Sequence, residues 1–153
     1  MPNAKALRPL FDVVYGKKAI ISENTATRTL KAKESGAMCL FDRAAGTVYT
    51  LPAGAEIGTT FEFMTAVTIT SGAAKVITAA GTELMVGAIV NTDTDSANAT
   101  LQFPALVGSS FIAVSMNGST TGGIIGDYFR CTKVTATKWS VTGHTLGTGV
   151  VAT

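Results

Sequence analysis

Short apolar or alternating runs, separated by turn residues, dominate the chain from about residue 44 onward. Side chains of a strand point alternately to its two faces, so runs of this length and pattern predict short β-strands. Nine such runs are found, at Thr47–Leu51, Thr59–Met64, Val67–Thr70, Lys75–Thr78, Leu84–Val90, Ala99–Phe103, Phe111–Met116, Tyr128–Val134 and Lys138–Thr142. Many short strands at such spacing are typical of a sandwich, jelly roll or barrel. We therefore predict an all-β fold, with a β-sandwich or jelly-roll-like body over residues 44–153.

The last two runs predict a hairpin with one dry face and one wet face. Trp139 and Val141 share one phase of the alternation. The other phase holds polar side chains, at Lys138, Ser140 and Thr142. Because successive side chains point to opposite faces, Trp139 is expected in the core. Core positions are also favoured over a base-stacking or sugar-binding platform for the phenylalanines of the strands, among them Phe61, Phe63 and Phe129.

Residues 1–43 differ from the body and predict an extended N-terminal arm, partly strand. Its apolar segments at residues 10–15, 19–21 and 38–41 are separated by charged or small stretches, without helix caps or sustained helical periodicity. An exposed apolar strand is an aggregation hazard unless a sheet accepts it. The arm therefore either completes the sheets of its own domain or docks on another subunit by strand addition.

Composition and charge separate the arm from the body more clearly. The 153 residues suit one domain, and only 14% of them are charged, so much of the polarity comes from 24 threonines, which favour strands. Residues 1–33 carry a net charge of +5, whereas the remainder carries −3, which gives +2 overall. So small a net charge argues against a nucleic-acid partner. The arm residues expected to contact a partner are Lys5, Arg8, Phe11, Tyr15, Lys17, Lys18 and Arg28.

Segments that direct a chain to a membrane are not found in the sequence. It has no apolar run of 18 residues, and the N-terminus lacks the charged, apolar and small-residue regions of a signal peptide. We therefore expect synthesis in the cytoplasm of the host cell and no membrane partner.

The cytoplasm keeps thiols reduced, so Cys39 and Cys131 are expected as two buried free thiols rather than a disulfide.

Candidate chemistry is sparse. The one histidine, His144, has no second histidine and no nearby acid in sequence except Asp127, so a surface or turn position is favoured over a catalytic base. Two cysteines and one histidine at scattered positions give no zinc spacing. Asp93 and Asp95 alternate with small polar residues, but the segment lacks the central Gly and distal Glu of a calcium loop.

Two further stretches resemble enzyme motifs only in part. The Gly-rich residues 118–126 are followed by no Lys-Ser/Thr pair and no predicted helix, which argues against a phosphate cradle. Residues 108–110, Gly-Ser-Ser, do not form the Gly-x-Ser-x-Gly elbow of a serine nucleophile. The sequence therefore predicts no catalytic residue, no metal site and no cofactor.

Four segments between residues 44 and 146 carry a resemblance to a known class of protein. They are Tyr49–Gly54 (YTLPAG), Gly58–Phe63 (GTTFEF), Gly126–Lys133 (GDYFRCTK) and Thr137–His144 (TKWSVTGH). A strand ending in Thr-Leu-Pro, a Gly-led strand with paired Phe, and a final Gly-Asp strand with a Trp-containing partner resemble the capsid decoration, or cement, proteins of tailed bacteriophages and related head or tail surface modules. These motifs mark strands and turns, so no functional residue is carried over from the resemblance.

The resemblance implies a non-enzymatic structural role on a virion. The expected protein binds the outer surface of a phage head and stabilises the shell by bridging capsid subunits. Its expected partners are the major capsid protein of the same phage and further copies of itself, in a homotrimer. The alternative is a host-recognition module of a tail or head fibre, which would bind glycan through an exposed aromatic side chain. A small β-fold enzyme is the third and least favoured hypothesis.

Overall fold

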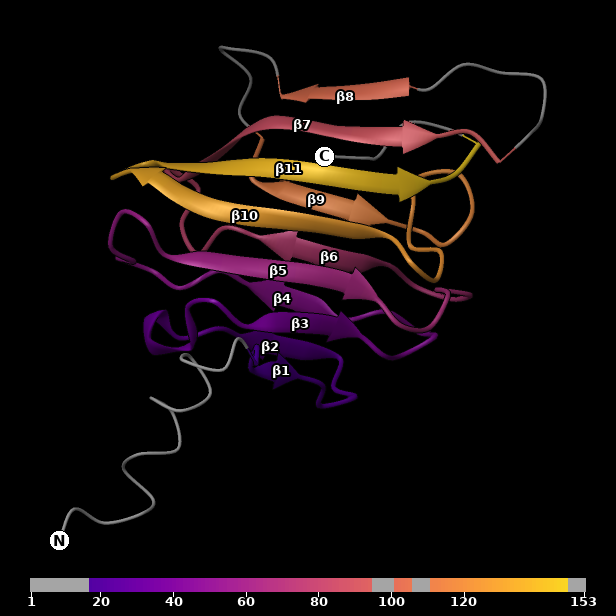
Figure 1. Ribbon diagram of the computed structural model, residues 1–153, viewed down its shortest axis with the longest axis horizontal. Coiled ribbons are helices and arrows are strands. Elements are labelled where there is room, and N and C mark those ends of the chain that lie inside the picture. Colours follow the sequence, from indigo (N-terminus) through magenta and orange to yellow (C-terminus); the bar gives the residue numbers. More distant parts are fainter. Residues whose placement is uncertain (1–16, 95–100, 106–110, 149–153) are drawn as a thin grey trace, which may run out of the picture.

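Two β-sheets form the protein, as the alternating runs predict. The computed structural model describes residues 17–94, 101–105 and 111–148, without the side chains of 101–105. The large sheet has the strand order β1-β3-β5-β10-β11-β7-β8, and the small sheet has the order β2-β4-β6-β9 (Figure 1). The strands are β1 (Ile20–Ile21), β2 (Thr27–Thr29), β3 (Met38–Phe41), β4 (Val48–Thr50), β5 (Thr60–Thr65), β6 (Ala74–Ile77), β7 (Leu84–Thr92), β8 (Leu101–Ala105), β9 (Ala113–Met116), β10 (Tyr128–Thr135) and β11 (Lys138–Leu146). A 3-10 turn, Ala32–Glu34, precedes β3. The all-β prediction is confirmed.

Successive strands from β1 to β7 alternate between the two sheets. As a result β1, β3 and β5 are parallel neighbours in the large sheet, and β2, β4 and β6 are parallel neighbours in the small one. The antiparallel hairpin of β10 and β11 lies between β5 and β7. A jelly roll is built from antiparallel strands, so the mixed pairing does not confirm the jelly-roll part of the prediction.

Eight of the nine predicted strands coincide with observed ones. The exception is Val67–Thr70, which is a loop. Its backbone amides donate to carbonyls of other loops and strand ends: Val67 N bonds Phe41 O and Ile69 N bonds Gly123 O. Because Ile69 is buried while Val67 is exposed, this loop imitates the alternation of a strand without joining a sheet ladder.

Residues 17–43 of the predicted N-terminal arm pair with the strands of the body. Both β1 and β3 pair within the large sheet, and β2 pairs with β4 in the small one. The side chains of Cys39 and Phe41 in β3 are fully buried. Of the two possibilities that the sequence left open, this part of the chain follows the first, because its strands complete the sheets of their own domain. Residues 1–16 lie outside the described residues.

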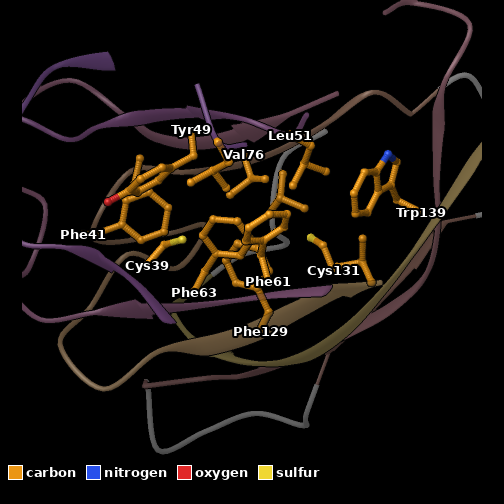
Figure 2. Close-up of a cluster of buried hydrophobic side chains, with 14 of the residues drawn as sticks. Cys39, Phe41, Tyr49, Leu51, Phe61, Phe63, Val76, Phe129, Cys131 and Trp139 are labelled. Carbon is orange, nitrogen blue, oxygen red and sulfur yellow. The ribbon is translucent and has the colours of Figure 1, made fainter. Parts of the chain in front are cut away.

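The core fills the space between the two sheets, as Figure 2 shows. Aromatic rings from four strands are in contact: the ring centroids of Tyr49 and Phe41 are 5.3 Å apart, those of Tyr49 and Phe63 are 5.6 Å apart, and those of Phe63 and Phe129 are 5.1 Å apart. The Tyr49 hydroxyl donates to Leu40 O at 2.7 Å, which satisfies the one polar group of this buried ring. The expected core residues Phe61, Phe63, Phe129 and Trp139 are each 1% exposed or less.

Candidate functional site

A cluster of charged and polar side chains lies buried at the turn end of the β10–β11 hairpin. Lys133 of β10 is 1% exposed, and its Nζ lies 2.6 Å from Oε1 of Glu83, which immediately precedes β7. The second oxygen of the carboxylate, Oε2, accepts a hydrogen bond from Trp139 Nε1 at 3.0 Å. The ammonium also lies 5.1 Å from the centroid of the Trp139 ring. Side chains from β10 and β11 therefore meet at one carboxylate, which the sequence did not single out.

The electrostatics of this cluster favour a structural role. Burial alone would raise the pKa of Glu83, but the hydrogen bonds from Lys133 and Trp139 and the charge of Lys133 outweigh it and hold that pKa below its ordinary value. The carboxylate is thus a poor proton donor or acceptor near neutral pH. The sequence contains a signal for the burial of Lys133. It lies two residues after Cys131 and four after Phe129, so its side chain points to the same buried face of β10 as these two apolar residues.

The opposite end of the hairpin also buries a carboxylate, that of Asp127. Its Oδ2 accepts hydrogen bonds from the backbone amides of Gly123 and Ile124 at 2.7 and 3.1 Å, and its Oδ1 accepts one from Leu146 N at 2.9 Å. Burial raises the pKa of Asp127, and the three backbone hydrogen bonds offset this rise only in part. Gly123 has a φ of 90°, so the turn that aims its amide at Asp127 needs glycine. The backbone amides of the Gly-rich stretch therefore bind a carboxylate of the same protein, that of Asp127.

A cavity of about 630 Å³ opens at the N-terminal corner of the molecule. It is lined by the 3-10 turn and by the loop before β5, with the residues Ala32, Lys33, Ser35, Gly54, Glu56, Ile57, Gly58 and Thr59. Lys33 is exposed, and Ile57 is 69% exposed. Lys17 lies at the same end of the large sheet, because Ala19 O accepts from Met38 N at the start of β3. Glu56, which is also exposed, is the one acidic residue of this lining. We call the surface the basic corner and define it by Lys17, Lys31, Lys33 and Ile57, because its three lysines outnumber that carboxylate.

The predicted arm contacts divide into three groups. Lys17 is exposed. Lys18 pairs with Glu62, and Arg28 pairs with Glu34 at 2.6 Å and with Glu23 at 3.3 Å. These two cations pair with carboxylates of their own chain, and their contact with a partner stays a prediction. The others, Lys5, Arg8, Phe11 and Tyr15, lie outside the described residues.

The remaining candidate groups are not brought together. His144 is exposed on β11, with its ring centroid 6.3 Å from that of Tyr128. Cys39 and Cys131 are free, buried thiols. Burial raises the pKa of Cys39 to about 12 and raises that of Cys131 as well, so neither is a ready nucleophile. Asp93 precedes the undescribed residues 95–100, and the Gly-Ser-Ser stretch at 108–110 falls within another undescribed segment.

Within the described ranges, the buried charged side chains of Glu83, Asp127 and Lys133 bond to other groups of the same chain. No group of three or more His, Cys, Asp or Glu residues there could hold a metal ion. Nor does that part of the chain contain a helix long and apolar enough to cross a membrane. Trp139 is fully buried and cannot be an exposed aromatic for glycan. Compared with known proteins, the sequence matches no protein-family model and no curated protein.

Proposed function

We propose that this protein is a non-enzymatic structural component of a tailed-phage virion, a decoration or cement protein of the outer head surface. The observation that carries the proposal is that the segments on which the resemblance rests form one packed unit. They contribute β4, β5 and the β10–β11 hairpin, which belong to both sheets. Tyr49, Phe63 and Phe129, one from each of three segments, follow one another in ring contact between the sheets. Motifs that form one structural unit support a shared fold better than scattered matches do.

The basic corner is the proposed attachment surface. It combines exposed ammonium groups with the apolar side chain of Ile57, next to an open cavity. Positive charge here complements an acidic capsid surface and orients the approaching protein, while Ile57 supplies apolar area. Copies that meet as a homotrimer, the arrangement which the resemblance implies, would each contribute such a corner. Several modest contacts on neighbouring capsid subunits then add up through avidity.

The first test is whether the protein is a constituent of phage heads. Heads of the phage that encodes it should be purified by density gradient, and the protein should be quantified against the major capsid protein by mass spectrometry. A fixed stoichiometric ratio that survives repeated purification is expected. Its presence in the lysate but absence from purified heads would exclude a cement function and would favour another role, such as the glycan-binding alternative.

A charge reversal tests the attachment surface separately. Lys33→Glu should lower the occupancy of heads, and the loss should be greater at low salt, where charge interactions are less screened. Lys138→Glu is the matched control, because Lys138 is also exposed but lies on β11, two strands away from β5 in the large sheet and outside the basic corner. Equal occupancy for both variants and the unchanged protein would contradict the assignment of this corner, even if the head location were correct.

A further inference from the structure

The outer face of the β10–β11 hairpin presents four neighbouring side chains. Cross-strand pairing places Tyr128 opposite His144 and Arg130 opposite Thr142. Residues two apart on a strand share a face, and the intervening Phe129 is buried, so these four side chains point away from the core. Tyr128 is half-buried and the other three are exposed. We call this set the hairpin quartet. It lies between β5 and β7, away from both edges of the large sheet (Figure 1).

Arg130 supplies a positive charge that no ion pair neutralises. Its cross-strand neighbour on β5 is Glu62, but that carboxylate pairs with Lys18 instead. With the described residues, the guanidinium of Arg130 forms neither a hydrogen bond nor an ion pair. An exposed guanidinium of this kind is ready to bind an anionic group of a ligand.

Tyr128 is the aromatic member of the hairpin quartet, and its hydroxyl is anchored. Its ring centroid lies 6.3 Å from that of His144, and the planes of the two rings are tilted by 38°. Burial raises the pKa of Tyr128, and the charge of Glu62 and a hydrogen bond with that carboxylate add to the rise. Because the side chain is already held in place, little conformational freedom is lost when a ligand packs against the ring.

We propose that the hairpin quartet binds an acidic sugar, that is, a sugar unit that bears a carboxylate. The planar fork of the Arg130 guanidinium matches a carboxylate through two parallel hydrogen bonds. A sugar ring carries C–H groups on its faces, which pack against the Tyr128 ring. The hydroxyls at its edge exchange hydrogen bonds with the imidazole of His144 and the hydroxyl of Thr142. Each of the four side chains therefore has a complementary group on one ligand.

The composition of the hairpin quartet favours a sugar over a macromolecular partner. Its three exposed members are polar, whereas the centre of a protein–protein interface is apolar and poor in charge. Single-stranded nucleic acid is bound along a groove lined by several cations, and the quartet contains one arginine and no lysine. The inference adds a ligand to the protein and rests on the hairpin alone, so it does not depend on the proposed function.

Titration of the full-length protein with two acidic probes, sialyllactose and trigalacturonic acid, tests the proposal. Lactose and the methyl ester of trigalacturonic acid are their neutral counterparts. Amide chemical shifts measured by NMR report both the place of binding and the dissociation constant. At least one acidic probe should shift the amides around the hairpin quartet until they saturate. Its neutral counterpart should bind at least about tenfold more weakly, because it lacks the charge that Arg130 pairs with.

The test variant is Arg130→Gln, which should weaken binding of the acidic probe by about tenfold or more. Lys138→Gln is the matched control, because it removes the same charge from an exposed position of β11 outside the hairpin quartet. This control should bind the probe as the unchanged protein does.

Four results would overturn the proposal. The first is that neither acidic probe gives saturable shifts at the hairpin quartet, and the second is that Arg130→Gln binds as tightly as the unchanged protein. The third is equal affinity for an acidic probe and its neutral counterpart, or displacement of the probe by the same concentration of inorganic phosphate, which would indicate a site for any small anion. The fourth is tighter binding of oligothymidylate than of either sugar, which would assign the face to single-stranded nucleic acid.

Discussion

The two ends of the β10–β11 hairpin each bury one carboxylate but stabilise it by different means. At the turn end, Glu83 contacts a lysine ammonium and an indole N–H. At the open end, Asp127 receives three backbone amides. The pKa of Glu83 is held below its ordinary value, because the hydrogen bonds of Lys133 and Trp139 and the lysine charge outweigh burial. The pKa of Asp127 is raised, because burial outweighs its amide hydrogen bonds. Asp127 is also the more completely buried of the two, at 1% exposure against 8% for Glu83, so its amide hydrogen bonds have a larger effect of burial to offset than the lysine charge has at Glu83.

The difference also determines what each end requires of the sequence. The cluster at Glu83 depends on three side chains, one before β7 and two in the β10–β11 hairpin, so a substitution at any one leaves at least one buried polar group without its partner. The Asp127 end depends on backbone shape, because the amides point correctly only while the Gly-rich turn keeps its conformation. We therefore expect the turn end to be the more sensitive to side-chain replacement.

Truncating the indole should produce the largest effect of all. Trp139→Ala removes a fully buried ring and the N–H donor to Glu83. The free energy of unfolding should fall by about 3–5 kcal/mol through lost burial and the cavity that remains. Denaturant unfolding followed by circular dichroism measures it. A stability close to that of the unchanged protein would show that the turn end is not a core contact.

Removing only the lysine charge should lower the free energy of unfolding nearly as much. Lys133→Met keeps the length of the side chain but leaves the Glu83 carboxylate buried without its ion pair, at about 3–5 kcal/mol. Adding Glu83→Gln to this variant should recover much of the loss, because an uncharged pair needs no counterion. Lys138→Met, at an exposed position on β11, is the control and should change stability by about 0.5 kcal/mol or less. If the double variant is no more stable than Lys133→Met, the pairing is not the cause.

The open end should be affected less. Asp127→Asn keeps the shape of the side chain but leaves only one oxygen to accept from the three backbone amides. Its NH₂ group then faces at least one of these N–H donors, which has no acceptor. The expected cost is about 1–3 kcal/mol in unfolding free energy. Asp42→Asn is the control, because Asp42 also accepts hydrogen bonds, from Ser22 and Asn24, but does so at the exposed surface. A larger loss at Asp127 than at Lys133 would reverse the ranking of the two ends.

The sequence predicted the parts of this architecture that depend on local pattern. Alternation located most strands and the burial of Trp139, because the two-residue period of a strand is visible in any short window. Sheet membership was not predictable, since the parallel pairing of β1, β3 and β5 joins segments far apart along the chain. That is why residues 17–43 read as an arm although β3 lies inside the large sheet.

The candidate groups follow the same division. Lys133 stands out as a charge in an apolar phase, but its partner Glu83 is 50 residues away and no short pattern connects them. Asp127 was visible within a Gly-Asp strand start, whereas its donor Leu146 belongs to the far end of β11. A single strand pattern can therefore reveal that a polar group will be buried, but it cannot identify the group that compensates for its burial.

Acidification should separate the two carboxylates by the sign of their effect, with the smallest changes in stability. The pKa of Glu83 is lower in the folded state, so its contribution is present above the ordinary carboxyl pKa of about 4.3 and is lost as pH falls through the folded value. The pKa of Asp127 is raised on folding, so its contribution is present below about 3.9 and is lost as pH rises through the folded value.

Unfolding free energies measured between neutral and acidic pH should therefore diverge in opposite directions for two isosteric variants. Glu83→Gln should lose less stability on acidification than the unchanged protein does, because it no longer has a carboxylate that folding keeps ionised. Asp127→Asn should lose more, because it lacks the group whose protonation favours the folded state. Parallel pH profiles for the two variants would mean that both ends of the hairpin hold their carboxylates in the same way, and the contrast between cation and backbone amides would not stand.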